Sequence, residues 1–377
     1  MNGKVTVTHA QVLAWRLRRQ GLAPRTDASV PEVVERLAGV QAQVASSAQL
    51  AVASRQVSPS PDAVSQALDA RSIVKTWAMR GTLHWLTPAH MGAYLSLLGA
   101  ARTWEKPAWQ KAFGVSAAQM AAMGEAVDEV LDDRVLTRQE LTDALLSRAG
   151  FAGLAGQLSS GWGAVLKPLA WTGRLCQGPT RGQKVTFAAP RSWVPGWRGI
   201  PEPDEAAAVV IPAYLRAHGP ATPEAFDAWL LRGATRKATL RGWFASLGER
   251  LVPVEVDGAG GAYVLAEDAD ELARTEPSRE VRLLPGFDQY VLGPGTSDAR
   301  LIAPARRKAV SRAAGWISPV VVHAGRVVGV WDFTDEGVAV TLFEEDAEVP
   351  RAGLEAEVAH LARCTGREDR RLVVRRG

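Results

Sequence analysis

The 377-residue sequence contains few cysteines and no long apolar run, and each scarcity excludes a class of protein. Its two cysteines, Cys176 and Cys364, lie far apart, so we expect buried thiols and no disulfide framework. No apolar stretch approaches the roughly 20 residues that a membrane-spanning helix needs. The N-terminus shows no basic segment, apolar core and cleavage site of a secretory signal, so we expect a cytoplasmic protein.

Three kinds of catalytic motif are also missing. The glycine-rich stretches GPGTSD and DGAGGAY lack the lysine and Ser/Thr of a phosphate-binding loop, and no G-x-G-x-x-G joins a strand to a helix. The six histidines are too scattered for metal-ligand spacing, so we predict no structural zinc and no other cofactor. No G-x-S-x-G turn is present, so nothing indicates a serine nucleophile.

The composition that remains is typical of a globular protein of several units. Hydrophobic residues make up 47% of the chain and charged residues 22%, with a formal charge of +4 and a pI near 9.2. A chain of this length exceeds what one hydrophobic core usually serves, so we expect two to four packed units. The basic charge is compatible with a polyanionic partner, although many enzymes share it, so its distribution is more informative.

One outline, short helices closed by a β-hairpin, occurs three times. In the first copy an S-x-x-E capping box begins a helix at Ser29, and SIVKTWAMRGTLHWLT predicts two strands around an Arg80–Gly81 turn. The second copy has a capping box at Thr137 and a β-rich return, and the third ends in the hairpin LVPVEVDGAGGAYVLAED. Short helices followed by a hairpin are the outline of a winged helix.

We therefore predict an α+β fold with three tandem winged helix-turn-helix units and a C-terminal β-rich region. The predicted boundaries are 1–87 for the first unit, 88–192 for the second, 193–200 for a linker, 201–274 for the third unit, and 275–377 for the C-terminal region. The linker is rich in proline, glycine and tryptophan, which interrupt periodicity. In the C-terminal region, a tight turn from His323 to Arg326 joins two strands.

Basic residues are ordered in the segment LLRGATRKATLRGWF, which predicts a helix. Arg232 and Arg236 are four residues apart, and so are Lys237 and Arg241. Two interpretations remain open, a stripe that contacts DNA phosphates and a solvated helix face. A second basic group is equally ambiguous and comprises Arg306, Arg307, Lys308 and Arg312.

The stretch ERLAGVQAQVASSAQL places two amides, Gln41 and Gln43, in an apolar setting. Residues two apart on a helix point about 200° from each other, so both amides can address one site only where the chain is extended or turning. Gly39 and Ser46 on either side permit such a break. An isolated polar residue of this kind is more often a cap or loop residue than a catalyst.

Four segments together resemble the winged-helix DNA glycosylase family of AlkZ and YcaQ, namely LAGVQAQ, TWAMRGTLHWL, LLPGFDQYVLG and GWISPVVVHAGRVVGVWDF. The resemblance covers nearly the whole chain. Gln41-Ala42-Gln43 is similar to the Q-x-Q of the AlkZ branch, whereas the YcaQ branch has Q-x-D. The resemblance implies a C-shaped particle whose basic concave face holds duplex DNA. It also implies excision of N7-alkylguanine, including interstrand cross-links from natural-product alkylating agents, in DNA repair or self-resistance.

The resemblance assigns Gln41 and Gln43 as the catalytic pair, and the hairpin of His323 and Arg326 as an element that probes DNA. Amides suit this reaction because an N7-alkylated guanine is already cationic and leaves as a neutral base. An amide can still orient the attacking water or stabilise the sugar. We expect Gln43 to position the water and Gln41 to fix that water or the deoxyribose, and the reverse is equally compatible.

Further candidates each have two interpretations. Asp288, in PGFDQY, is either a base or electrostatic group favoured by apolar surroundings, or a carboxylate that accepts backbone hydrogen bonds at a strand turn. Arg80 and His84 either contact DNA or brace the first unit.

The expected partner is double-stranded DNA with N7-alkylpurine lesions, with no membrane and no obligate protein partner, for a monomer associated with the bacterial nucleoid. Two other functions remain open. A winged-helix transcription regulator would prefer one operator sequence and leave glycosidic bonds intact. A non-catalytic lesion-binding protein would share the basic surface but would not require the two amides.

Overall fold

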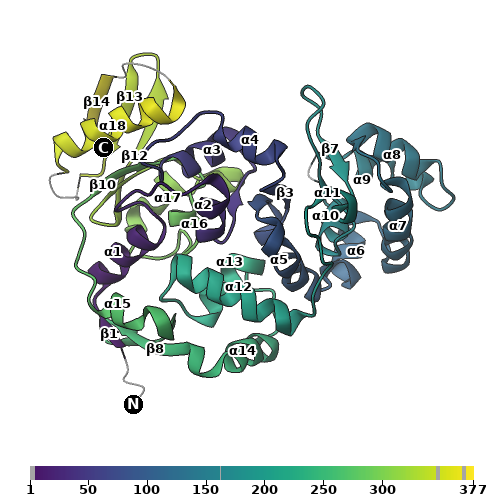
Figure 1. The fold of residues 1–377 in the computed structure, drawn as a ribbon, viewed down its shortest axis with the longest axis horizontal. Coiled ribbons are helices and arrows are strands. Elements are labelled where there is room, and N and C mark those ends of the chain that lie inside the picture. Colours follow the sequence, from purple (N-terminus) through teal and green to yellow (C-terminus); the bar gives the residue numbers. More distant parts are fainter. Residues whose placement is uncertain (1–4, 162, 345–348, 367–370) are drawn as a thin grey trace.

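The computed structural model describes residues 5–161, 163–344, 349–366 and 371–377. Runs of helices are separated by short strands along the chain, and Figure 1 shows two parts that lie side by side. The smaller part, on the right, runs from α6 (Pro107–Phe113) to α11 (Pro190–Trp193). The larger part holds the segments before and after it, so the chain leaves the larger part once and returns.

The first copy of the predicted outline folds as expected. The capping box is confirmed, because Glu32 accepts the Ser29 backbone N–H at 2.7 Å. The strands form an antiparallel sheet in the order β2-β4-β3. The turn between β3 and β4 contains Arg80 and Gly81, as predicted. The elements are α2 (Val30–Arg36), β2 (Val40–Gln41), α3 (Ala45–Ala53), α4 (Ala63–Asp69), β3 (Val74–Trp77) and β4 (Leu83–Leu86).

The second copy forms most of the smaller part of the molecule. Its capping box is also confirmed, because Glu140 accepts the Thr137 backbone N–H at 2.6 Å. Its sheet has the order β5-β7-β6. The elements are α7 (Ala117–Val130), β5 (Leu136–Thr137), α8 (Arg138–Leu146), α9 (Ala155–Ser159), α10 (Leu166–Trp171), β6 (Cys176–Gln177) and β7 (Thr186–Ala188). It is joined to the first copy by α5 (Pro88–Ala100), which packs against α12 (Pro203–His218).

The third copy begins with α12 and repeats the same connectivity. Ala221 forms a single β-bridge with Tyr263 in β9, in the place that β2 and β5 occupy in the other copies. The remaining elements are α13 (Pro223–Leu231), α14 (Lys237–Ser246), β8 (Leu251–Val256), β9 (Ala259–Leu265) and α15 (Ala269–Ala273). In all three copies the first strand pairs with the third, and the third pairs with the second. One topology is therefore used three times.

The N-terminal segment does not pack with the first copy. β1 (Val5–Val7) adds to the third sheet, parallel to β8. Leu13 and Leu17 of α1 (His9–Arg19) belong to an apolar cluster with residues of the C-terminal region. The predicted unit 1–87 thus includes a strand and a helix that lie elsewhere, because their apolar faces are covered by segments far along the chain.

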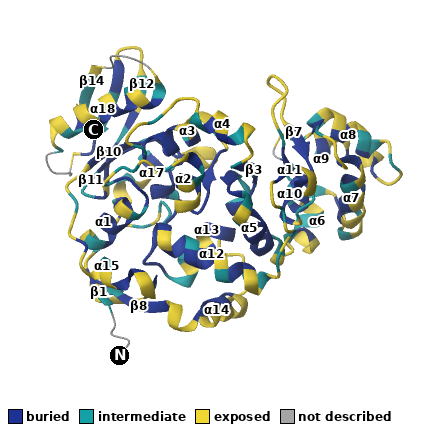
Figure 2. Cartoon of the chain, viewed as in Figure 1, coloured by how far each residue is buried: buried dark blue, intermediate teal, exposed yellow. Residues whose placement is uncertain are grey.

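The C-terminal region contains the predicted sheet, whose five strands have the order β10-β11-β12-β13-β14. All neighbours are antiparallel except β13 and β14. Figure 2 shows its buried strands beneath the more exposed α18. The elements are β10 (Val281–Leu284), α16 (Gln289–Leu292), α17 (Arg307–Val310), β11 (Val320–His323), β12 (Arg326–Thr334), β13 (Gly337–Leu342), α18 (Arg351–Thr365) and β14 (Arg371–Arg376).

The apolar core joins the three copies. Its largest cluster takes residues from Ala38 to Leu265 and so includes all three copies, although most of the first copy also has an apolar cluster of its own, from Val30 to Trp85. Cys176 and Cys364 are both free and buried, as expected. In the described segments, no helix is both long and apolar enough to cross a membrane.

Candidate functional site

The two predicted amides lie on an extended segment beside the first hairpin. β2 ends at Gln41, which pairs with His84 of β4, and the Ala42 N–H then donates to the Leu83 carbonyl at 2.7 Å. This confirms the extended backbone that a shared site requires. Gln41 is buried, with 6% of its surface exposed, whereas Gln43 is exposed.

Both amides are oriented by donors of this hairpin. Arg80 donates from Nη2 to Gln41 Oε1 at 3.1 Å, and the Leu83 backbone N–H donates to Gln43 Oε1 at 3.3 Å. Guanidinium and backbone N–H groups only donate, so each amide must turn its oxygen toward the hairpin. Each oxygen keeps one lone pair, and within the described ranges neither NH₂ group has a hydrogen bond.

Arg80 is held in place by contacts with two units. It lies in the turn with a φ of 57°, and its Nη1 donates to the Trp229 carbonyl of α13 at 2.9 Å. Burial, together with the nearby positive charge of Arg232, lowers the pKa of Arg80 to about 10. Arg80 therefore remains charged at neutral pH, and it connects the third copy of the fold to Gln41.

His84 does not reach the surface. Its ring is fully buried, and Nδ1 lies 3.0 Å from the Thr82 carbonyl, so Nδ1 carries the proton and donates it. Burial and the charge of Arg80 lower the pKa of His84 to about 3, so the ring is neutral at physiological pH. Of the two interpretations, the structure supports the one in which His84 braces the first sheet and not the one in which it contacts DNA.

Asp288 is likewise a structural residue. Arg55 donates to both of its carboxylate oxygens, at 2.7 and 2.8 Å, and both side chains are fully buried. The Tyr290 backbone N–H donates to Oδ1 at 2.8 Å. Of its two interpretations, the structure supports the carboxylate that accepts a backbone hydrogen bond and not the base, because this paired carboxylate is fully buried. Nothing in the local sequence indicated Arg55, which lies 233 residues away.

The turn that carries His323 and Arg326 joins β11 and β12 as predicted, and it packs against another part of the chain. The Gly325 carbonyl accepts the Tyr290 hydroxyl at 2.7 Å, and a Cβ on Gly325 would lie 2.5 Å from Cβ of Leu13. The turn is thus packed against α1. Arg326 is nevertheless exposed and His323 half-buried, so both side chains remain partly accessible. Their role in probing DNA stays a prediction.

Another hairpin projects from the molecule instead. The loop between β6 and β7 is exposed from residue 179 to residue 185, and it extends beyond its neighbours in Figures 1 and 2. It carries Arg181, which forms an ion pair with Glu140 at 3.1 Å, and Lys184. The basic segment TRGQK could have indicated this loop in the sequence. That the loop projects from the molecule depends on the surrounding fold.

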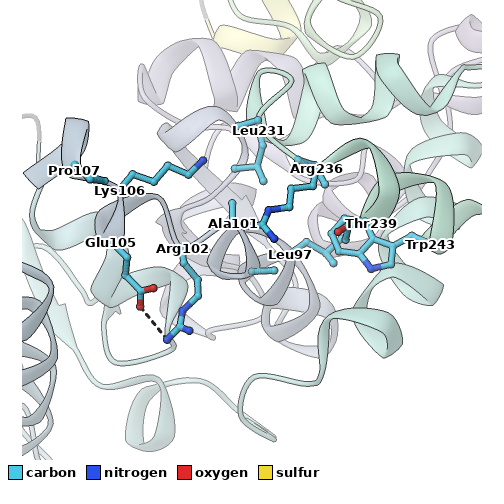
Figure 3. A pocket seen from close by; sticks show the side chains of 13 residues that line it. Leu97, Ala101, Arg102, Glu105, Lys106, Pro107, Leu231, Arg236, Thr239 and Trp243 are labelled. Carbon is cyan, nitrogen blue, oxygen red and sulfur yellow. Dashed lines mark ion pairs between the residues drawn. The ribbon is translucent and has the colours of Figure 1, made fainter.

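The basic segment is not one helix as predicted, because α13 ends at Leu231 and α14 begins only at Lys237. Lys237 and Arg241 are exposed on α14, while Trp243 and Phe244 face the core. Arg236 precedes the helix and lines a cavity of about 540 Å³. In Figure 3, Lys106 extends into this cavity from the opposite side. Arg236, Lys237 and Arg241 therefore present their charges to solvent. This agrees both with contact to DNA phosphates and with a solvated helix face.

Comparisons with known proteins identify the family. A family model described as "DNA glycosylase AlkZ-like" matches residues 34–364. The chain belongs to the AlkZ-like DNA glycosylase family. A Streptomyces sahachiroi protein named interstrand DNA cross-link repair glycosylase is 52% identical over 357 residues, covering 94% of this chain and 96% of that protein. The solved structure of Streptomyces sahachiroi DNA glycosylase AlkZ matches with a TM-score of 0.95 and 51% identity, covering 99% of this chain and 100% of the other.

These matches confirm the resemblance inferred from the sequence. The AlkZ-like chain is a DNA glycosylase, a hydrolase of N-glycosyl bonds. The part of this glycosylase that the structure describes contains no cluster of three or more His, Cys, Asp or Glu side chains that could hold a metal ion.

Proposed function

We propose that this glycosylase hydrolyses the N-glycosidic bond of N7-alkylguanine in duplex DNA, including bulky adducts and interstrand cross-links, with Gln41 and Gln43 as its catalytic pair. One observation carries the proposal. Two amides, one at the end of β2 and one just after it, both accept a hydrogen bond from one hairpin through their oxygens, and their NH₂ groups have no hydrogen bond in the described ranges. The name of the Streptomyces sahachiroi relative supports cross-linked DNA as a substrate.

Neutral side chains are sufficient for this reaction. The alkylated guanine takes the electrons of the glycosidic bond and leaves as a neutral base, so it needs little proton donation. Water then adds to the oxocarbenium-like sugar and loses a proton to solvent. The exposed Gln43 holds this water through its remaining carbonyl lone pair, while the buried Gln41 steadies the water or the sugar.

The architecture that supports this function is three tandem winged helices in a C-shape around DNA. The repeated strand order supports the units 88–192 and 201–274, separated by the linker 193–200, and the C-terminal region 275–377. The unit 1–87 is reduced by its first strand and helix, which pack elsewhere. The enzyme acts as a monomer, because each copy of the fold is completed within one chain.

Backbone contacts position the DNA, and Arg236, Lys237 and Arg241 supply them near α14. His323 and Arg326 probe the DNA beside the lesion, and the projecting β6–β7 loop, with Lys184, is a second candidate for a groove contact. A cross-linked nucleotide is tethered to the opposite strand and cannot rotate fully out of the duplex, so an open site suits this substrate better than a deep pocket. Affinity then falls steeply with salt.

The test is release of free base from a duplex that contains N7-methylguanine, measured in single turnover with abasic sites counted in parallel. We expect Gln43→Ala and Gln41→Ala to lower the rate by about 10²- to 10³-fold, as loss of a transition-state contact does. Gln49→Ala, at an exposed glutamine of α3, is the matched control and keeps the wild-type rate.

Near wild-type rates in both amide variants would refute the catalytic assignment. Sequence-specific binding without base release would favour a transcription regulator. Tight binding to lesions without release would favour a protein that only shields the adduct.

A further inference from the structure

Three cations from three separate segments meet around the Arg80–Gly81 turn, where Arg80 bonds Gln41. Arg80 comes from the first hairpin, Lys167 from α10 and Arg232 from the end of α13. Arg80 bonds the Trp229 carbonyl, three residues before Arg232, and a Cβ on Gly81 would lie 3.8 Å from Nζ of Lys167. Each of the three copies of the fold thus contributes one cation.

No carboxylate in the described ranges forms an ion pair with any of these three side chains, although 18 ion pairs occur elsewhere in those ranges. Burial and then Arg232 lower the pKa of both Arg80 and Lys167, so the three charges repel one another. Charges that leave water are normally paired. Arg80 and Lys167 are half-buried without a carboxylate partner and Arg232 is exposed beside them, so the cluster can receive an anion from solvent.

The chemistry of the substrate selects the anion. Both the alkylated guanine and the oxocarbenium-like sugar are cationic, so unpaired cations beside Gln41 would repel the reacting nucleotide. A backbone phosphate between the cations and the sugar removes this repulsion. Arginine and lysine are the usual ligands for phosphate oxygens.

We propose that Arg80, Lys167 and Arg232 form a clamp for one backbone phosphate beside the lesion, which sets the lesion sugar against Gln41 and Gln43. The inference rests on the proposed function and extends it to a specific phosphate. The guanidinium of Arg80 also holds the Gln41 oxygen, so it couples the clamp to the amide. Arg80 and Lys167 act as positioning residues for the reaction.

The test replaces the phosphates around an N7-methylguanine one at a time with neutral methylphosphonate. We expect one replacement to lower kcat/KM of the wild-type enzyme by about 10- to 100-fold, in the range of a charge-assisted contact. Lys167→Met and Arg232→Met keep the apolar part of each side chain. In these variants the same replacement costs less than about threefold, and the salt dependence of log K weakens by about 0.9 per lost contact.

Arg241→Met is the matched control, because Arg241 is exposed on α14 outside the cluster. It weakens the salt dependence but keeps full sensitivity to the critical methylphosphonate. Lys167→Arg restores that sensitivity. Wild-type sensitivity in Lys167→Met and Arg232→Met, or equal tolerance of methylphosphonate at every position, overturns the clamp. If the wild-type enzyme releases no base from a duplex with an unmodified backbone, the proposed function is wrong instead. The clamp is then tested by comparing the affinity of the enzyme for the same duplexes with and without each methylphosphonate.

Discussion

Two hairpins of this protein have similar turns and different surroundings. The turn between β3 and β4 has two consecutive left-handed residues, Arg80 and Gly81, with φ of 57° and 70°. The turn between β11 and β12 has Ala324 and Gly325, with φ of 50° and 81°. In the first, a side chain of the turn reaches Gln41, whereas in the second the turn itself is packed against α1. The conformation of the turn therefore does not decide which hairpin contacts the candidate site. The segments that pack around the turn decide it.

The largest expected effect tests the packing of the second turn. Gly325→Ala should lower the free energy of unfolding by about 3 kcal/mol, because left-handed strain adds to overpacking against Leu13. Gly81→Ala should cost only about 1 kcal/mol, since the nearest atom, Cδ of Lys167, lies 3.7 Å from the new Cβ. Urea unfolding followed by circular dichroism measures both variants. Equal losses would contradict the difference in packing.

The next effect tests whether the turn between β3 and β4 orients the catalytic amides. Arg80→Met should slow release of N7-methylguanine by about 100-fold, because Gln41 loses the donor that orients it. Arg326→Met on the other hairpin should change the rate by less than about threefold. Single-turnover rates at saturating enzyme separate this loss from weaker DNA binding. Similar rates in the two variants would show that neither hairpin orients the amides.

The smallest effect is a pH dependence of stability at the first hairpin. The folded-state pKa of His84, about 3, lies below the ordinary value of 6.5, so the unfolded chain binds this proton first. His84 therefore contributes full stability above pH 6.5, and that contribution falls by about 1.4 kcal/mol per pH unit toward pH 3. Burial also lowers the pKa of His218 to about 3 and the pKa of His360 to about 4, so each adds a further slope of this kind.

Unfolding free energies between pH 4 and pH 6 measure this effect. His84→Gln should remove about a third of the combined slope of His84, His218 and His360. Thr76→Val is the control, because Thr76 lies opposite His84 in the sheet, is equally buried and does not titrate. An unchanged slope in His84→Gln would mean that the ring is protonated in the folded protein.

Much of the fold could be predicted because its signals are local. The capping boxes at Ser29 and Thr137 involve residues three apart, and both form as predicted. The hairpin at Arg80–Gly81 and the sheet of the C-terminal region follow from alternating β-branched residues and turn residues. The order of four short motifs was sufficient to indicate the family, which the comparisons confirmed.

The candidate site could be predicted only in part. The spacing of Gln41 and Gln43 indicated an extended segment, but it did not reveal the bond between Arg80 and Gln41, 39 residues apart. Asp288 was a candidate base because its partner Arg55 could not be recognised from local sequence. Lys167 was not a candidate at all, because a single lysine on a short helix has no distinguishing pattern.

The sequence by itself determined the helices, the hairpins, the threefold outline and the family, because hydrogen bonding and apolar periodicity are specified within a few residues. Only the tertiary structure decided which polar groups face solvent. It buried His84 and Asp288, packed the His323–Arg326 turn on α1, and brought Lys167 and Arg232 to the Arg80–Gly81 turn. Burial and charge at a residue depend on segments that arrive from far along the chain, and no local pattern encodes which ones will.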